Sequence, residues 1–270
     1  MPAQEKKPAD AKREAPPEQS IFKDKNLEAA VRKYVFEKRD TDKPITAADV
    51  ANISTIKATG LGIKDLTGLE KCLKLASLDL AKNEVKDISA LKGLNILQQL
   101  DLSSNQIADI APLAECPALQ YVELSNNRVT TIQPLAGLTN LASVYLSNNQ
   151  IKDISPLFKL PRVSSLYADQ NQVVDITGIA QLKRLTSLSL SKNHIVDIAP
   201  LNGLDGLYFL FLEENLIEDL TPLYDMLKKD FEGEKRFAPF VNVYLKGNPL
   251  KGASKSALSK MKNLGVRVNS

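Results

Sequence analysis

The sequence predicts an α/β solenoid in which short parallel strands stack side by side and turn segments return the chain between them. Three observations predict this fold: a fixed spacing of asparagines, an apolar pattern that repeats with them, and differently built segments at both ends. Seven asparagines follow one another at intervals of 22 residues: Asn83, Asn105, Asn127, Asn149, Asn171, Asn193 and Asn215. Each ends a version of the phrase Leu-x-x-Leu-x-Leu-x-x-Asn, as in LASLDLAKN at residues 75–83. A unit with such a period buries its apolar side only by stacking on its neighbours.

Two segments precede the repeats. Residues 1–20 hold four prolines and many charged side chains, so we expect a disordered tail. Residues 21–52 predict a helical N-terminal cap, because apolar residues recur there at helical spacing after an N-cap at Asp24 or Asn26. The phrase ITAADV at residues 45–50 predicts a second, short helix that begins with a capping box. Such a cap would cover the core that the first repeat otherwise exposes.

Residues 53–252 hold the repeats, which we expect to supply about nine strands. The recurring asparagines form what we call the asparagine ladder, with Asn248 as its last member. The chain turns sharply at each of them and leaves backbone N–H and C=O groups inside the stack. A carboxamide can both donate to and accept from such groups. We therefore expect the ladder to be structural and not a set of ligand contacts, and its loss at one position to cost roughly 1 to 3 kcal/mol.

Each phrase is followed by a return segment of similar composition. Apolar residues recur two and five positions after each asparagine, and both columns must face inward. One position before the second column, an acid recurs with Thr131 as the exception: Asp87, Asp109, Asp153, Asp175, Asp197 and Asp219. Asp or Thr caps a short helical turn, and the proline that often follows fits its first turn. A calcium ladder is the weaker interpretation, because one carboxylate per repeat lacks the six to eight oxygens that calcium requires. We expect neither a metal nor another cofactor.

This repeat resembles the 22-residue leucine-rich class found in bacterial internalin-like proteins, and also that of the regulatory subunit of a eukaryotic protein phosphatase. The resemblance covers roughly residues 50–250. It implies a curved solenoid with a parallel β-sheet on the concave face, short 3-10 or helical turns on the convex face, and helical caps at the ends. The motifs are specific for the fold and say little about the ligand.

The period breaks at the C-terminal end. From Asn215 the next matching asparagine is Asn248, 33 residues on, so 11 residues have been inserted. Helical spacing of apolar residues predicts that the last return segment is a longer helix, followed by a charged loop and a strand at residues 240–245. Residues 253–270 predict a C-terminal cap made of a helix and a closing strand. This end is basic and has no acidic residue after Glu234. We interpret the lysines as a solvated face, and expect no nucleic-acid partner.

Several function classes are disfavoured by composition. The chain is 43% hydrophobic and 25% charged, and no apolar run is long enough to span a bilayer, so we expect no membrane insertion. The sole histidine, His194, occupies an expected surface turn. No phosphate loop, metal-ligand spacing or nucleophile elbow is present, which argues against an enzyme. Cys72 and Cys116 lie two repeats apart, roughly 10 Å, which is too far for a disulfide. We expect both to be buried free thiols.

The positions that remain are those the strands present outward on the concave face, the third and fifth of each phrase. Aromatic residues fill six of these eighteen positions, although they make up only 6% of the chain. The face divides into three sections: an acidic stretch of Asp79, Asp101 and Glu123; an aromatic middle of Tyr121, Tyr145 and Tyr167; and an apolar patch of Phe209, Phe211 and Tyr244, bordered by Asp169, Glu213 and Glu214.

Rigid, tyrosine-rich surface is typical of protein interfaces. The first hypothesis is therefore a non-enzymatic module, monomeric, that binds a protein or peptide with a basic segment through this face. Two alternatives stay open. Rows of exposed Tyr and Phe also suit carbohydrate or a cell-wall polymer, and a purely structural spacer would bind no ligand.

The first residues bear on location. The sequence opens with a charged stretch rich in Pro and Ala and shows no apolar leader segment. Such a stretch often follows a removed leader. We expect a bacterial envelope or secreted protein, with a cytoplasmic location as the alternative.

Overall fold

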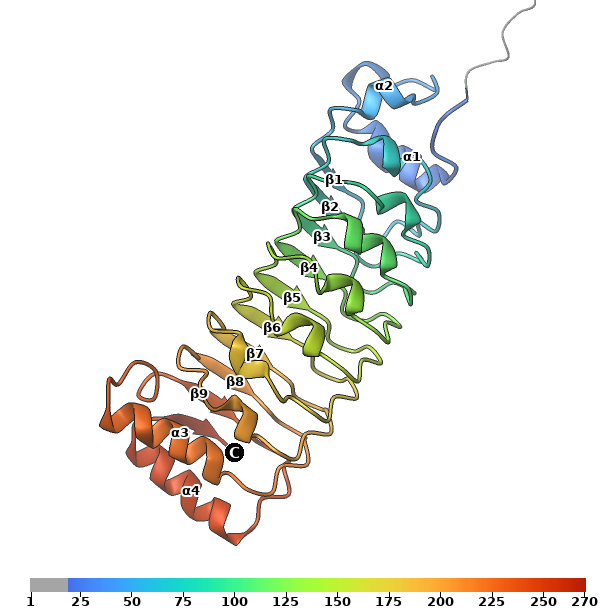
Figure 1. The fold of residues 1–270 in the computed structure, drawn as a ribbon. Helices are drawn as coiled ribbons and strands as arrows, with labels where there is room; N and C mark the ends of the chain where they lie inside the picture. The colour runs from blue at the N-terminus through green and yellow to red at the C-terminus, as the bar shows by residue number, and fades with distance from the viewer. Residues whose placement is uncertain (1–18) are drawn as a thin grey trace, which may run out of the picture.

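The computed structural model describes residues 19–270, so the predicted disordered tail lies almost wholly outside the described residues. The chain forms one ten-stranded sheet whose strands follow sequence order, each parallel to the next (Figure 1). The strands are β1 Thr55–Lys57, β2 Ser77–Asp79, β3 Gln99–Asp101, β4 Tyr121–Glu123, β5 Ser143–Tyr145, β6 Ser165–Tyr167, β7 Ser187–Ser189, β8 Phe209–Phe211, β9 Asn242–Tyr244 and β10 Arg267–Asn269. The predicted leucine-rich repeat solenoid is confirmed.

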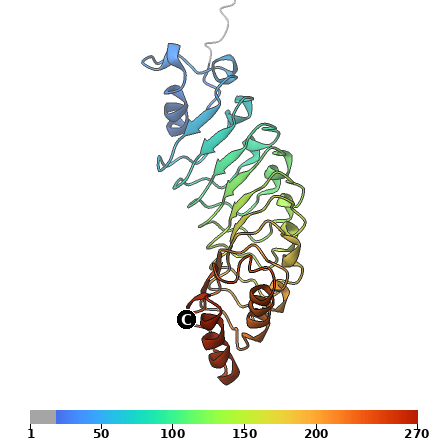
Figure 2. The ribbon, with the colours of Figure 1, turned by 90° about the vertical axis from the view of Figure 1, so that its left-hand side faces the viewer.

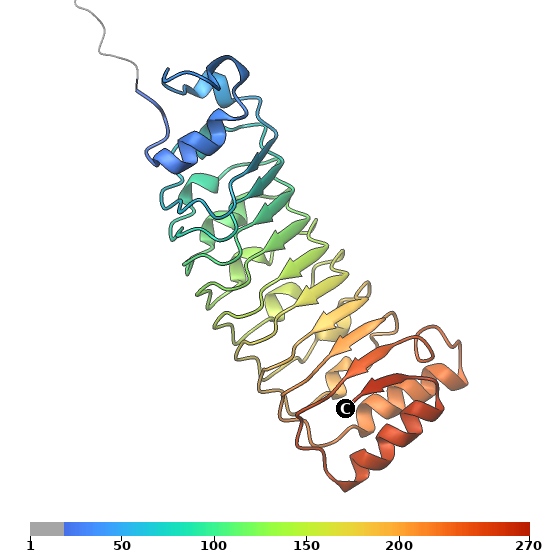
Figure 3. The same ribbon diagram turned by 180° about the vertical axis from the view of Figure 1, so that it is seen from behind.

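The strands pair without any offset in register. Tyr121 of β4 lies opposite Ser143 of β5, and Glu123 lies opposite Tyr145, as the shared position in the phrase requires. In β4 the central residue, Val122, is buried, while the residues on either side are half-buried. The third and fifth positions of the phrase therefore form two continuous columns across the outer side of the sheet (Figure 3).

Short 3-10 helices lie on the side opposite the sheet, one in most return segments (Figure 2). Those after the first cap are η2 Leu69–Lys71, η3 Ser89–Leu91, η4 Ala111–Glu115, η5 Gln133–Leu135, η6 Ser155–Leu157, η7 Ile179–Gln181 and η8 Ala199–Leu201. The predicted capping is confirmed: the Oδ1 atom of each recurring aspartate accepts the backbone N–H two residues on, at 2.8 Å. These carboxylates thus serve the turns of their own repeats.

The asparagine ladder joins each repeat to the one before it. In Asn105, the side-chain Nδ2 donates to the backbone oxygens of Leu80 and Leu102 at 3.0 Å, and Oδ1 accepts the N–H of Val85 at 3.0 Å. Asn248 repeats this arrangement with Leu212, Leu245 and Ile217, in spite of the insertion before it. The structural role predicted for the ladder is confirmed, because each carboxamide satisfies buried backbone groups in two neighbouring repeats.

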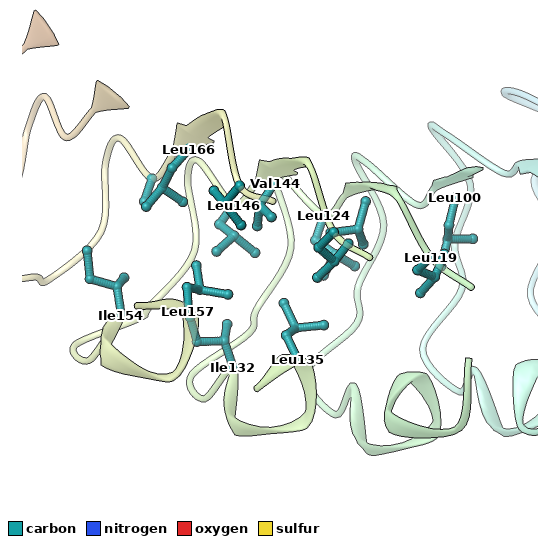
Figure 4. Close-up of a cluster of buried hydrophobic side chains, with 14 of the residues drawn as sticks. Leu100, Leu119, Leu124, Ile132, Leu135, Val144, Leu146, Ile154, Leu157 and Leu166 are labelled. Atoms are coloured by element: carbon teal, nitrogen blue, oxygen red, sulfur yellow. The ribbon is translucent and has the colours of Figure 1, made fainter. Parts of the chain in front are cut away.

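The apolar core runs the length of the solenoid between the sheet and the turns. Figure 4 shows strand residues such as Leu124 and Val144 facing turn residues such as Ile132 and Leu135, and all four are fully buried. Cys72 and Cys116 belong to the same core and are free, as predicted. Burial raises the pKa of the Cys72 thiol to about 12 and that of Cys116 to about 11. Both cysteines therefore act as small apolar side chains.

The N-terminal cap closes the first edge of the sheet. Helix α1, Lys25–Arg32, begins at Asp24, whose carboxylate accepts the N–H groups of Asn26 and Leu27; Asn26 is not the cap. Helix α2, Ala47–Val50, follows, and between them η1 covers Phe36–Lys38. The Tyr34 hydroxyl accepts the backbone N–H of Lys57 at 2.9 Å, which satisfies a donor on the unpaired edge of β1.

Two longer helices close the other end. Helix α3, Thr221–Glu232, fills the inserted return segment and packs on α4, Gly252–Asn263 (Figure 1). Buried Ser254 links them to the last repeat, since its hydroxyl donates to the Glu218 oxygen at 2.8 Å and accepts the Leu220 N–H at 2.9 Å. None of the described helices is long and apolar enough to cross a membrane.

The strand predicted at residues 240–245 is shorter in the structure. β9 begins at Asn242, and Phe240 is 55% exposed. The N–H groups of Phe240 and Val241 both donate to the Phe237 oxygen, so the chain is still turning there and lifts the Phe240 ring out of the core.

Candidate functional site

The concave face brings the three predicted tyrosines into one row, here called the tyrosine stack. The ring centroids of Tyr145 and Tyr167 lie 5.1 Å apart at an interplanar angle of 19°, and those of Tyr121 and Tyr145 lie 5.4 Å apart at 44°. The parallel register causes this contact, because residues at the same position on adjacent strands are separated by the strand spacing of about 4.8 Å. Each ring holds its neighbour in place, so the stack is a pre-organised, half-buried surface.

A second aromatic group, the phenylalanine patch, lies on β8 and β9. The Phe211 ring stacks on Tyr244 at 4.5 Å and 16° and on Phe209 at 6.2 Å and 8°. Phe209 is 41% exposed, and the neighbouring Tyr208 and Phe240 are more than half exposed. The sequence columns missed Tyr208 and Phe240, since neither occupies a third or fifth position of the phrase. The patch is the larger exposed apolar area of this face.

The predicted acidic residues lie side by side on β2, β3 and β4, and we call them the acidic column: Asp79, Asp101 and Glu123. One carboxylate oxygen of each accepts the backbone N–H two residues on, from Ala81 at 3.0 Å, Ser103 at 2.9 Å and Ser125 at 2.7 Å. Each acid therefore stabilises the turn after its own strand and has a second oxygen left. The sequence signal for this role was the small residue two positions after each acid.

Charge and burial interact within this part of the face. The pKa of Glu123 is raised because the carboxylate is desolvated and lies near Asp101. Burial, with Glu123 and Asp101 nearby, raises the pKa of the Tyr121 hydroxyl to about 12. A hollow of about 320 Å³ lies at the same place, lined by the side chains of Asp79, Asp101 and Tyr121 among others. The region is a negatively charged recess beside an aromatic ring.

The acids predicted to border the apolar patch are mostly occupied by contacts within the protein. Asp169 accepts hydrogen bonds from the hydroxyls of Ser147 and Ser189 and from the Ser191 N–H, so both of its oxygens join neighbouring repeats. Glu214 lies 3.7 Å from Lys192. Glu213 lies beside Ser191, whose hydroxyl accepts its backbone N–H. The structure thus separates Asp169, which braces the stack of repeats, from the acidic column.

The residues set aside by the sequence argument have ordinary surroundings. His194 is an exposed turn residue, as predicted. In the basic C-terminal cap, Lys251 pairs with Glu218 and Arg236 with Asp205. The Lys260 ammonium lies 5.5 Å from the centre of the Tyr224 ring. Several of these cations are therefore matched within the chain.

Comparisons with known proteins agree with this architecture. The family model for leucine-rich repeats in two copies matches residues 97–137, 139–181 and 183–225. No curated protein sequence matches the chain. Among solved structures, internalin C2 of Listeria monocytogenes is 35% identical with a TM-score of 0.72, over 76% of this chain and 91% of that one.

More distant structures share the fold. Internalin InlF of Listeria monocytogenes is 24% identical with a TM-score of 0.59, over 93% of this chain and 92% of that one. The leucine-rich repeat ectodomain of the Arabidopsis thaliana receptor kinase GASSHO1/SCHENGEN3, solved with CASPARIAN STRIP INTEGRITY FACTOR 2, is 22% identical with a TM-score of 0.65, over 82% of this chain and 27% of that one. The asparagine ladder, the ten parallel strands and the identity to internalin C2 together show that this chain belongs to the internalin-like leucine-rich repeat proteins.

Proposed function

We propose that this protein is a non-enzymatic, monomeric module that binds a protein or peptide with a basic segment along its concave face. Leucine-rich repeat proteins of this type mediate protein binding. The observation that carries the proposal is the tyrosine stack, in which Tyr145 and Tyr167 lie 5.1 Å apart on adjacent strands. Tyrosine has few rotatable bonds, so a row of packed tyrosines loses little entropy when a partner covers it.

The stacking also separates this proposal from carbohydrate binding. A sugar ring packs on the open face of an aromatic ring. The faces of Tyr145 and Tyr167 are turned toward each other, and Phe211 has a ring on either side. What the stacks present outward is largely ring edges and hydroxyl groups, which suit the mixed surface of a peptide or protein. A glycan array that gave strong, aromatic-dependent hits would favour the carbohydrate alternative.

The experiment replaces Tyr145 and Tyr167 by alanine together and measures capture of partners from the native source. Each partner identified is then purified and titrated against both proteins. We expect the double variant to lose the captured partner, with a far-ultraviolet circular dichroism spectrum like that of the original. Phe36→Ala is the matched control, because Phe36 is an 82% exposed aromatic on the N-terminal cap. Unchanged capture by the double variant would show that the site is wrong, and would favour the spacer.

The proposed location is the envelope or the exterior of a bacterial cell, where a partner on another surface could reach the concave face. Fractionation of the native source with an antibody to this protein tests it. Recovery of the protein only from the cytoplasm would contradict this part of the proposal.

A further inference from the structure

The chemistry of the concave face changes in a fixed order along the solenoid. The acidic column lies on β2 to β4, the tyrosine stack on β4 to β6, and the phenylalanine patch on β8 and β9. Each strand contributes only three residues, whereas the columns cross all ten strands. A ligand that lay along one strand would meet one kind of surface. A ligand that crosses the strands meets all three.

The acidic column has no cationic partner of its own. In the part of the chain that the structure describes, no lysine or arginine nitrogen lies within 4.0 Å of the carboxylates of Asp79, Asp101 or Glu123. Each of the three keeps one oxygen that its own turn does not use. Carboxylates this close together repel one another, and a ligand cation would relieve that repulsion. Charge complementarity therefore selects a basic group for this end of the face.

The Tyr121 ring refines the choice of cation. It lines the same hollow as Asp79 and Asp101. Its 44° tilt away from Tyr145 leaves it less covered than the rings of the parallel pair. A guanidinium group is planar, stacks on a tyrosine ring and offers a donor fork to carboxylates, whereas an ammonium is a compact, strongly hydrated charge. The recess is thus better matched to arginine than to lysine.

The opposite end of the face selects an apolar side chain. Phe209, Tyr208 and Phe240 are 41%, 52% and 55% exposed, and they surround the packed rings of Phe211 and Tyr244. Exposed aromatic area that is held rigid gains most from burial under another large apolar group. Between the two ends, β7 presents only Ser187 and Ser189, so a main chain can pass there without a bulky obstacle.

The distance between the two ends follows from the register. Asp101 on β3 and Phe211 on β8 are five strand spacings apart, which is about 24 Å at about 4.8 Å per strand. An extended peptide advances about 3.3 Å per residue, so this distance corresponds to about seven residues. The ligand that fits the face therefore has a defined spacing as well as a defined composition.

We infer that the partner segment, on the basis of the function proposed above, is an extended peptide that crosses the strands. It places an arginine in the recess of the acidic column and an aromatic side chain on the phenylalanine patch, about seven residues apart.

Synthetic peptides test this inference directly. Each carries two arginines at one end and one tryptophan at the other, separated by 3, 7 or 11 residues of Gly-Ser spacer, in both chain directions. The protein contains no tryptophan, so the fluorescence of the peptide indole reports its own burial. At low ionic strength we expect the seven-residue spacing to bind at least about tenfold more tightly than the others in one direction, because the two contacts then form together. Lysine in place of arginine should reduce binding.

Two protein variants assign the ends. Asp101→Asn with Glu123→Gln keeps the oxygens that accept from Ser103 and Ser125, and should remove the preference for arginine while the indole still shifts. Phe211→Ala should remove the indole shift. Asp109→Asn, a carboxylate on the convex side that caps its turn in the same way, is the control and should change nothing.

Several results would overturn the inference: no binding at millimolar peptide, equal affinity at all spacings, or equal affinity without arginine. If partner capture still depends on Tyr145 and Tyr167 in that case, the concave face binds a protein in another way and the proposed function stands. If capture is also unaffected by the tyrosine variants, both proposals are wrong.

Discussion

The backbone N–H of Lys64 donates to the Oδ2 atom of Asp24 at 2.7 Å, which ties the start of α1 to the first repeat across 40 residues of chain. The same carboxylate accepts the N–H groups of Asn26, Leu27 and Asp65. Asp24 is therefore both the cap of a helix and the clip that holds that helix on the solenoid.

Replacing Asp24 by alanine should loosen the N-terminal cap. Loss of a helix cap alone costs about 1 kcal/mol, and the clip to the first repeat is lost with it, so we expect about 1 to 2 kcal/mol. Hydrogen exchange followed by mass spectrometry should show faster exchange in residues 25–32 and little change beyond the first repeats. Asp42→Ala, at an exposed position of the same cap, is the control. Equal exchange in the two variants would refute the role of Asp24.

The N-terminal cap should also be the most acid-sensitive part of the chain. The pKa values of Asp24 and Asp49 lie below the ordinary 3.8: burial opposes this, but it is outweighed by backbone N–H donors at Asp24 and by Lys38 and Thr46 at Asp49. A group with a depressed folded pKa stabilises the fold above its unfolded pKa, and that stability is lost as the pH falls through the folded value. Protection of the α1 amides should therefore fall between about pH 4 and pH 2, before that of the central strands. Simultaneous loss in both regions would contradict this order.

Asn149 offers a test of the asparagine ladder. Its side chain accepts the Val129 N–H at 2.9 Å and donates to the oxygens of Leu124 and Leu146 at 3.0 Å. Alanine would leave these buried groups unpaired, so we expect a loss of at least about 2 kcal/mol in the free energy of unfolding. Urea unfolding followed by circular dichroism measures it. Gln150→Ala, next in the sequence and exposed, should stay within about 0.5 kcal/mol of the original protein. Similar losses for both would mean that the ladder is not structural.

Glu123→Gln should stabilise the protein at neutral pH. The folded pKa of Glu123 is raised by desolvation, so its protonated form is favoured in the fold, and that advantage is lost as the pH rises through the folded value. Glutamine stays neutral and still offers an oxygen to the Ser125 N–H. The variant should therefore have a higher unfolding midpoint than the original at pH 7, and the difference should disappear below about pH 4.5, the unfolded pKa. A variant less stable at pH 7 would show that the ionised carboxylate stabilises the fold.

The solenoid itself could be predicted because one rule repeats. The asparagine spacing defined which positions face the core, and Asn105, the two cysteines and the aspartate caps all lie where that rule places them. The Tyr145–Tyr167 contact also follows, since identical positions on parallel strands must be neighbours.

Other features could not be read from the phrase. The residue before each ladder asparagine has a left-handed backbone, as in Lys82 with φ 57° and Gln170 with φ 53°, although no glycine marks the position. The repeated carboxamide contacts hold that conformation, and local preference does not reveal it. Phe240 was assigned to a strand because its sequence is apolar, whereas the insertion before it changes the path of the chain. Ring tilt and the sharing of carboxylate oxygens depend on contacts between repeats that composition does not specify.

The absence of any offset between neighbouring strands has a genetic consequence. Every one of the nine pairings joins equivalent positions, so duplication or deletion of a single 22-residue unit would join surfaces of the same shape. Such an event between β5 and β7 would leave both ends of the concave face intact and change only the distance between them, by one strand spacing of about 4.8 Å. Recombination within the gene can therefore adjust the reach of this surface in equal steps, and each step would select a partner whose two contact points lie one or two residues farther apart or closer together.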